Sequence, residues 1–193
     1  MGETCQGGYV KFGFVCGRAC LNFAGTMKHR NTTREERLTH PGVLSEWAIQ
    51  AGLVDTDIEV SPDDLVTAVE VREAIYRTAT ARLDDREPMA ADVHLLNEHA
   101  ARPRLTPRLL TTGATSREGT AAQLIATLAA DLLDLLAGPD IGNVKRCDHP
   151  NCSLLYVDSS RAKNRHWCGM ATCGNKVKVQ AFRARQRASV ELS

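Results

Sequence analysis

Apolar residues through most of the chain recur at three- and four-residue spacing, which predicts a mainly helical fold. The strongest case is 121–137, where a leucine stripe repeats at this spacing and Gly138–Pro139 ends the helix. A second long helix starts after Ser61, a capping residue that is followed by a proline and two aspartates. Shorter helices are predicted around Trp47 and after Pro88.

β-Type residues interrupted by glycines occupy 9–23, near the start of the chain. This pattern predicts a short β-hairpin with its turn at 16–18. The polar stretch 27–39 is predicted to be a loop, and 102–119 fits either strands or an ordered loop. The expected fold class is therefore α+β, mainly α with a small β-hairpin.

Charge is segregated along the chain, although the net charge is only +1. The segment 145–187 holds ten Lys and Arg residues against two acids, whereas the rest of the chain is acidic. Such asymmetry indicates a polyanion as partner of the basic segment. The sequence shows neither a signal peptide nor an apolar run of the roughly 18 residues that a membrane span needs, so a cytoplasmic protein without a membrane partner is expected.

Four cysteines, Cys147, Cys152, Cys168 and Cys173, form two C-x4-C pairs separated by 15 residues. In a reducing compartment, paired cysteines bind metal more often than they form disulfides. Four thiolates suit one tetrahedral Zn²⁺ with no open coordination position, which predicts a structural metal site. An iron–sulfur cluster, a disulfide pair, or replacement of one ligand by His149 or His166 remain alternatives.

The metal-binding segment is predicted to be a module of its own, 143–193, with a domain boundary near Gly142 and a helical domain over 1–142. Two knuckles, a hairpin and a terminal helix predict a treble-clef-like or ribbon-like zinc finger with four cysteine ligands. Its basic and amide side chains form the predicted nucleic-acid surface. The candidates are Arg161, Lys163, Arg165, Asn175, Lys176, Lys178, Gln180, Arg183, Arg185 and Arg187. Of these, Asn175, Gln180 and Arg183 are candidates for base recognition.

The tail resembles the CGNR zinc-finger family, whose name quotes the run after the last ligand. Here this run is Cys173-Gly174-Asn175-Lys176, with Lys in place of the family's Arg. The Tyr156-Val157-Asp158-x-Ser160 turn and the Arg165-x-Trp167-Cys168 run also match.

The front of the chain resembles the ABATE domain that accompanies this finger. The family run Leu-Asp-Phe-x-Asn-Thr is here Leu21-Asn22-Phe23-Ala24-Gly25-Thr26, with Asn for Asp and Gly for Asn. Proteins of this architecture are described as stress-induced transcription regulators, mostly bacterial. The resemblance implies a regulator whose N-terminal domain senses a stress signal or dimerises.

Asn22 and Thr26 are candidates for a small-molecule effector pocket, with His29 or Arg30 near its mouth. The alternative is a capping network that joins loop to helix. Three further cysteines, Cys5, Cys16 and Cys20, suit a redox switch, a second metal site or plain apolar packing.

The sequence thus predicts a DNA-binding transcription regulator with a structural zinc finger. An RNA-binding zinc protein and a thiol or zinc redox sensor are the alternatives, and the low aromatic content of 5% favours DNA. A homodimer is expected because one small finger reads few base pairs. An enzyme is not expected, since no phosphate loop, triad-like spacing or open metal site is found.

Overall fold

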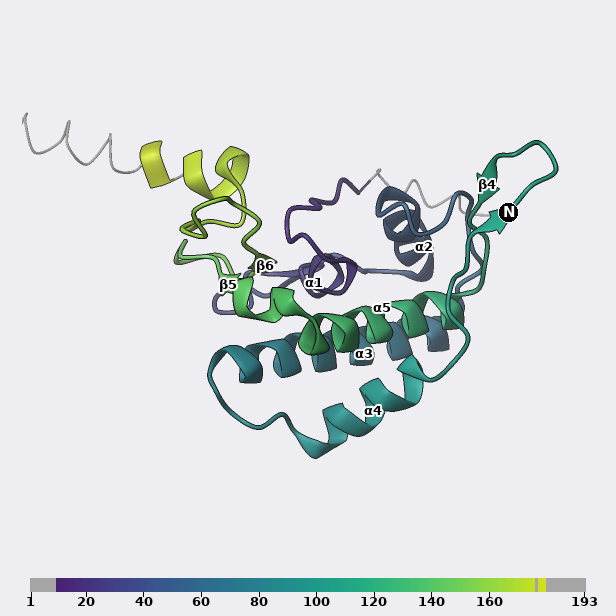
Figure 1. The fold of residues 1–193 in the computed structure, drawn as a ribbon, viewed down its shortest axis with the longest axis horizontal. Helices are drawn as coiled ribbons and strands as arrows, with labels where there is room; N and C mark the ends of the chain where they lie inside the picture. The colour runs from purple at the N-terminus through teal and green to yellow at the C-terminus, as the bar shows by residue number, and fades with distance from the viewer. Residues whose placement is uncertain (1–9, 176, 180–193) are drawn as a thin grey trace, which may run out of the picture.

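The computed structural model describes residues 10–175 and 177–179. Two long helices, α3 (Pro62–Leu83) and α5 (Ala121–Ala137), pack against each other, and α4 (Ala90–Ala100) contacts both (Figure 1). The short helix α1 (Ala19–Ala24) packs on α3 and α5, and α2 (Pro41–Gln50) contacts α3. The predicted helical fold is confirmed.

Capping boxes fix the starts of both long helices. The Ser61 hydroxyl accepts a hydrogen bond from the Asp64 amide at 3.1 Å, and the Asp64 carboxylate accepts one from the Ser61 amide at 2.9 Å. Thr120 and Gln123 form the same reciprocal pair at the start of α5. The leucine stripe of α5 is buried as predicted.

The β-hairpin predicted over 9–23 is wrong. Among the described residues of this segment none is in a strand, and α1 begins at Ala19. The extended chain instead bonds to side chains of α2, because the Val10 amide donates to Glu46 Oε1 and the Phe12 amide donates to Gln50 Oε1. These side chains replace the partner strand that the β-type sequence predicted.

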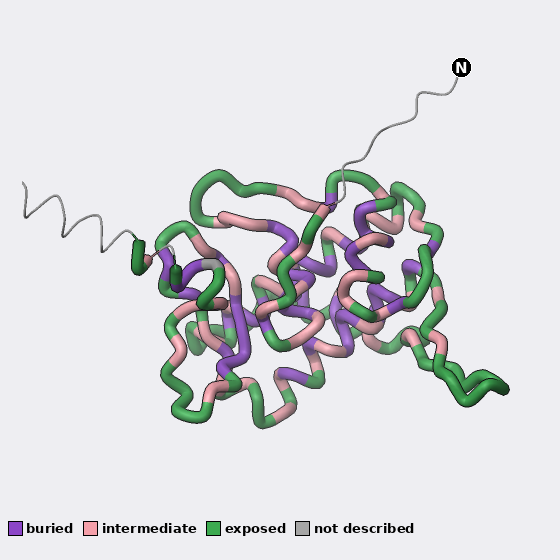
Figure 2. The backbone as a smooth tube through the Cα atoms, turned by 90° about the horizontal axis from the view of Figure 1, so that it is seen from above, coloured by how far each residue is buried: buried purple, intermediate pink, exposed green. Residues whose placement is uncertain are grey.

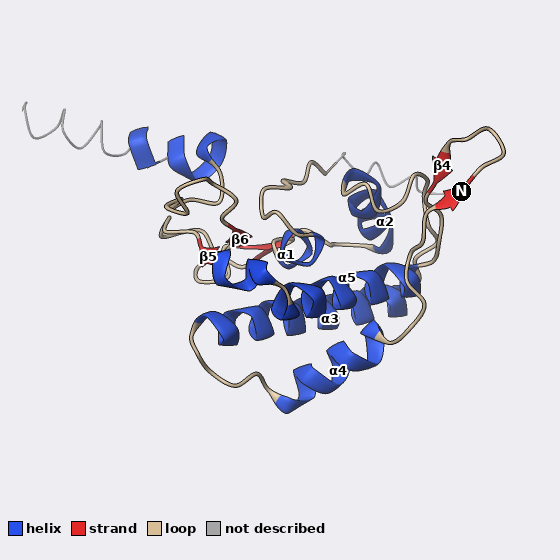
Figure 3. Ribbon diagram, in the orientation of Figure 1, coloured by secondary structure: helices blue, strands red, loops and turns tan. Residues whose placement is uncertain are grey.

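The strands of the described residues form three short antiparallel pairs (Figure 3). The pairs are β1 (Met27–Lys28) with β2 (Glu35–Glu36), β3 (Arg108–Leu109) with β4 (Thr115–Ser116), and β5 (Val144–Arg146) with β6 (Leu155–Val157). The first pair lies where a loop was predicted. The β3–β4 pair lies at the opposite end of the molecule from the turn Met170–Gly174 (Figure 1).

Buried residues form one continuous core that runs through both parts of the chain (Figure 2). Trp47 packs against Phe23 with ring centroids 5.0 Å apart, and Leu155 and Tyr156 of β6 belong to the same core. The Val157 amide donates to the Cys16 carbonyl at 2.8 Å, so β6 is anchored beside α1. The domain boundary near Gly142 stays a prediction. No helix of the described residues is long and apolar enough to cross a membrane.

Candidate metal centre

The four cysteines predicted as metal ligands converge at one point. The sulfurs of Cys147, Cys152, Cys168 and Cys173 all lie within 4.8 Å of one another. The Sγ–Sγ distance is 3.9 Å between Cys152 and Cys168 and 3.6 Å between Cys168 and Cys173. A tetrahedral zinc ion with Zn–S bonds of about 2.3 Å separates its sulfurs by about 3.8 Å, so the quartet fits zinc.

Backbone hydrogen bonds shape the two knuckles around this point. The Cys147 amide donates to the Leu154 carbonyl at 3.0 Å, and the Cys152 amide donates to the His149 carbonyl at 2.8 Å. The Cys168 amide points at Cys147 Sγ over 3.4 Å, and Cys173 lies in a π-helical turn, Met170–Gly174. These bonds hold the two knuckles with their sulfurs facing one point.

The electrostatics of the quartet favour a metal cation. Hydrogen bonds from the thiols of Cys152 and Cys168 lower the pKa of the Cys147 thiol. Zinc at this point would be held by the deprotonated form of the four cysteines. The centre holds one structural zinc ion, and all four of its positions are filled by sulfur.

The two histidines considered as alternative metal ligands make other contacts instead. His149 Nδ1 accepts from the Asn151 amide at 3.2 Å, and His166 Nδ1 lies 2.8 Å from the Asp148 carboxylate. Neither residue belongs to the group of side chains that surround the metal position.

Asp158 organises the turn that leads to the second knuckle. Its side chain accepts from the Ser160 amide at 3.0 Å, from Lys145 Nζ at 2.8 Å and from the Arg165 amide at 2.9 Å. The bond from Lys145, and then those from Ser160, hold the pKa of this buried carboxyl well below its usual range. The turn predicted at 158–160 is present.

The predicted nucleic-acid residues other than Arg165 divide into three groups. Arg161, Asn175 and Lys178 are exposed, and their side chains have no partner among the described residues. Lys163 is exposed, but its Nζ donates to the Asp158 carbonyl at 2.8 Å. The remaining candidates Lys176, Gln180, Arg183, Arg185 and Arg187 lie outside the described residues.

Arg165 has an internal role instead. Its Nε donates to the Trp167 carbonyl at 2.7 Å and its Nη2 to the Val15 carbonyl at 3.3 Å. The guanidinium also lies over the Tyr156 ring, 4.5 Å from the centroid. Arg165 therefore joins the finger to the N-terminal segment.

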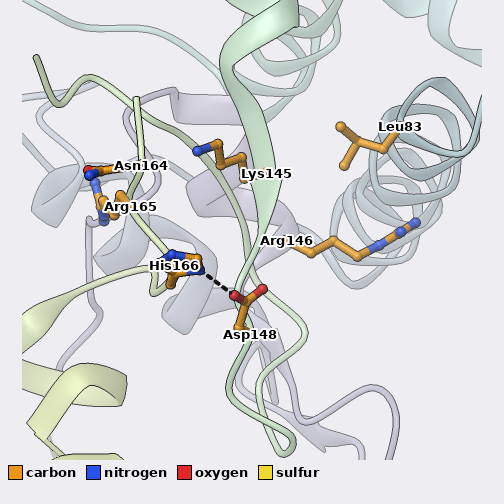
Figure 4. A pocket seen from close by; sticks show the side chains of 7 residues that line it. All are labelled: Leu83, Lys145, Arg146, Asp148, Asn164, Arg165 and His166. Atoms are coloured by element: carbon orange, nitrogen blue, oxygen red, sulfur yellow. Dashed lines mark hydrogen bonds and ion pairs between the residues drawn. The ribbon is translucent and has the colours of Figure 1, made fainter. Parts of the chain in front are cut away.

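An open groove of about 450 Å³ beside the knuckles is lined by several basic residues (Figure 4), and two of them, Lys145 and Arg146, are paired with acids. Arg146 pairs with Asp84 at 2.7 Å, and Lys145 pairs with Asp158 at 2.8 Å. Hydrogen bonds from Arg146 and then from Arg86 lower the pKa of Asp84 to about 2. Arg161 and Lys178 lie outside this groove, and neither has an acidic partner among the described residues.

Three of the four predicted effector residues line a cavity of about 200 Å³. Asn22, Thr26 and His29 line it, whereas Arg30 turns away to pair with Glu73 and to lie over the Tyr76 ring. The predicted network is also present, since Asn22 Oδ1 accepts from the Cys16 amide at 3.0 Å. The Thr26 hydroxyl likewise donates to the Phe23 carbonyl at 2.7 Å.

Sequence reasoning missed the second wall of this cavity. Cys152, Ser153 and Leu154 of the finger contribute to it. They lie more than a hundred positions from Asn22, and no local pattern signals such a contact.

Cys16 and Cys20 are buried in the core. Burial, together with the neighbouring Cys168, raises the pKa of the Cys16 thiol to about 12, and burial and Asp131 raise that of Cys20. Arg18 pairs with Asp131 at 2.7 Å. These surroundings favour apolar packing over a reactive thiol. Cys5 lies outside the described residues.

Two family models match the chain. Residues 17–139 match the ABATE model, described as "Putative stress-induced transcription regulator". Residues 143–186 match the model of the CGNR zinc finger. The resemblance seen in the sequence is confirmed in both parts and in their order. No curated protein matches the chain.

Proposed function

Because the chain belongs to the ABATE family and carries a CGNR zinc finger, we propose that it is a DNA-binding transcription regulator. The finger presents exposed basic side chains to the phosphate backbone of a duplex. The ABATE part supplies regulation, through a small-molecule effector and through dimerisation.

One observation supports this proposal most directly. The zinc site is closed by four sulfurs, and the side chains of Arg161 and Lys178 nearby are exposed and unpaired among the described residues. A closed zinc site stabilises a small module without offering a position for an activated water, which favours binding over catalysis. Lysine and arginine side chains without internal partners are available to phosphates.

DNA is favoured over RNA because the tyrosine and the tryptophan of the described part of the finger offer little ring surface for base stacking. Tyr156 is fully buried under Arg165, and Trp167 is partly buried against the core. Recognition of single-stranded RNA relies on exposed aromatic platforms. Asn175 is exposed just after the last zinc ligand and is the described candidate for a base contact.

The test is duplex binding by the zinc-loaded protein at several salt concentrations. For the double variant Arg161→Ala and Lys178→Ala we expect weaker binding to every duplex. The plot of log K against log salt should also become less steep, its negative slope shrinking in magnitude by about 2, at roughly 0.9 per phosphate contact. Arg183→Ala with Arg187→Ala should act in the same direction.

The matched control removes two arginines at the other end of the molecule, Arg104→Ala with Arg108→Ala near the β3–β4 pair. This variant should bind duplexes like the original chain. Unchanged binding by both finger variants, each with its full zinc content, contradicts the proposal. Preference for single-stranded RNA over duplex DNA would point to the RNA alternative.

A further inference from the structure

The 200 Å³ cavity lies between the ABATE part and the zinc finger. Asn22 of α1, Lys28 of β1 and Thr26 between them line it on one side, and Ser153 and Leu154 of the first knuckle line it on the other. An apolar cavity of roughly 150 Å³ holds benzene. This cavity therefore suits a molecule of about one ring with a small polar substituent.

The body of such a ligand would meet apolar side chains. Phe12 and Val15 come from the extended N-terminal segment, Trp47 comes from α2, and Leu154 comes from the finger. Small-molecule sites have this character, with a few polar groups that set orientation.

The polar groups of the lining offer hydrogen-bond donors. Asn22 Oδ1 is occupied by the Cys16 amide, which leaves its Nδ2 without a partner among the described residues. The Ser153 hydroxyl accepts from the Arg30 amide at 3.1 Å, so its own hydrogen is available. Lys28 has no ion pair within the described part of the chain. All three donors call for an acceptor on the ligand.

The charges around the cavity disfavour ions of either sign. Three zinc ligands, Cys152, Cys168 and Cys173, line it, and a zinc ion with four thiolates carries a net charge of about −2. This charge repels an anion that Lys28 would attract, and Lys28 repels a cation that the zinc site would attract, so no ion is favoured by both charges. No acidic side chain is among the described residues that line the cavity.

We propose that this cavity binds a small, uncharged and largely apolar carbonyl compound, whose oxygen accepts hydrogen bonds from Asn22, Ser153 and Lys28. The ligand contacts the ABATE part and the finger together, so its binding is linked to the packing of the finger against the ABATE part. This compound would be the effector that the proposed function assigns to the ABATE part, and its regulatory role rests on that proposed function.

Three probes of equal size and different charge test the ligand class. Acetophenone is a neutral carbonyl compound, benzoate is an anion and benzylamine is a cation. Binding to the zinc-loaded full chain is measured by ligand-observed NMR and by tryptophan fluorescence, since Trp47 lines the cavity. We expect saturable binding of acetophenone, about tenfold tighter than that of either ion.

Two variants test the location. Lys28→Met should weaken acetophenone binding about three- to tenfold through loss of one donor, whereas Lys11→Met, which removes an exposed lysine outside the lining, should not. Gly13→Leu should abolish binding by filling the cavity, because Gly13 lines it and a Cβ there meets no atom within 4 Å.

Tighter binding of benzoate or benzylamine overturns the ligand class, and no saturable binding of any probe at low millimolar concentration overturns the site. Acetophenone binding that persists in zinc-loaded Gly13→Leu also overturns the site. Duplex binding is scored separately. If the chain binds duplex DNA but none of the probes, this inference is wrong and the proposed function stands. If it binds acetophenone but no duplex, the proposed function is wrong and the ligand site stands.

Discussion

At the residue scale, Arg72 carries a charge that is fully buried and yet compensated. Its guanidinium donates to both carboxylate oxygens of Glu36, at 2.6 and 2.7 Å, and to Glu73 at 2.9 Å. Burial would raise the pKa of Glu36, but the bonds from Arg72 and from the Leu38 amide outweigh it and lower the pKa below 4.5. Arg72 thereby holds the β1–β2 pair against α3.

Replacement of Arg72 by methionine should lower the free energy of unfolding by about 3 kcal/mol, because it leaves partly buried carboxylates without their partner. This value lies at the low end for buried pairs since the Glu36 side chain is 32% exposed. Urea denaturation measures the change. Arg82→Met, an exposed arginine on the same helix, is the control, and an equal loss in both variants would refute the role of Arg72.

The Arg72–Glu36 ion pair also predicts how the free energy of unfolding depends on pH. The pKa of Glu36 is lower in the folded state than its ordinary 4.5, so its contribution is complete above about pH 5 and is lost as the pH falls through the folded pKa. The stability difference between the original chain and Arg72→Met should therefore shrink in acid.

At the element scale, capping boxes determine the residue at which each of the two long helices begins. Ser61 and Asp64 satisfy two backbone amides that would otherwise lack partners at the start of α3. This interaction is local, and it explains why the start of the helix was predictable without any knowledge of tertiary contacts.

Ser61→Ala should cost about 1 kcal/mol of stability, because the Asp64 amide loses its acceptor. Chemical denaturation followed by circular dichroism measures the loss. Ser159→Ala, which removes an exposed hydroxyl outside a helix, provides the matched control. If the free energy of unfolding falls no further in Ser61→Ala than in the control, the cap does not contribute to the stability of the native state.

At the scale of the whole molecule, the zinc finger and the helices share one core. Leu155 and Tyr156 of β6 pack into it, the Val157 amide bonds to the Cys16 carbonyl, and Arg165 bonds to Val15. The zinc site is therefore coupled by packing to the part of the chain that precedes it.

Removal of zinc with a chelator should leave most of the helical circular dichroism at 25 °C but lower the melting temperature of the helices by about 10 °C, the effect expected for about 3 kcal/mol of lost packing. Readdition of zinc should restore the original value. An unchanged melting temperature would show that the helices do not depend on the finger.

The sequence by itself determined the features whose causes are local. The helix starts at Ser61 and Thr120, the leucine face of α5 and the two cysteine knuckles follow from spacing and capping, which act over a few residues. The charge of the tail is likewise a property of composition.

Only the tertiary structure decided the rest. The N-terminal segment stays extended without a partner strand because α2 supplies Glu46 and Gln50, and Arg165 bonds to Val15 instead of facing solvent. The cavity forms because β6 folds back beside α1, which joins residues more than a hundred positions apart. Packing and hydrogen bonds between distant segments depend on the whole chain, so no local pattern encodes them.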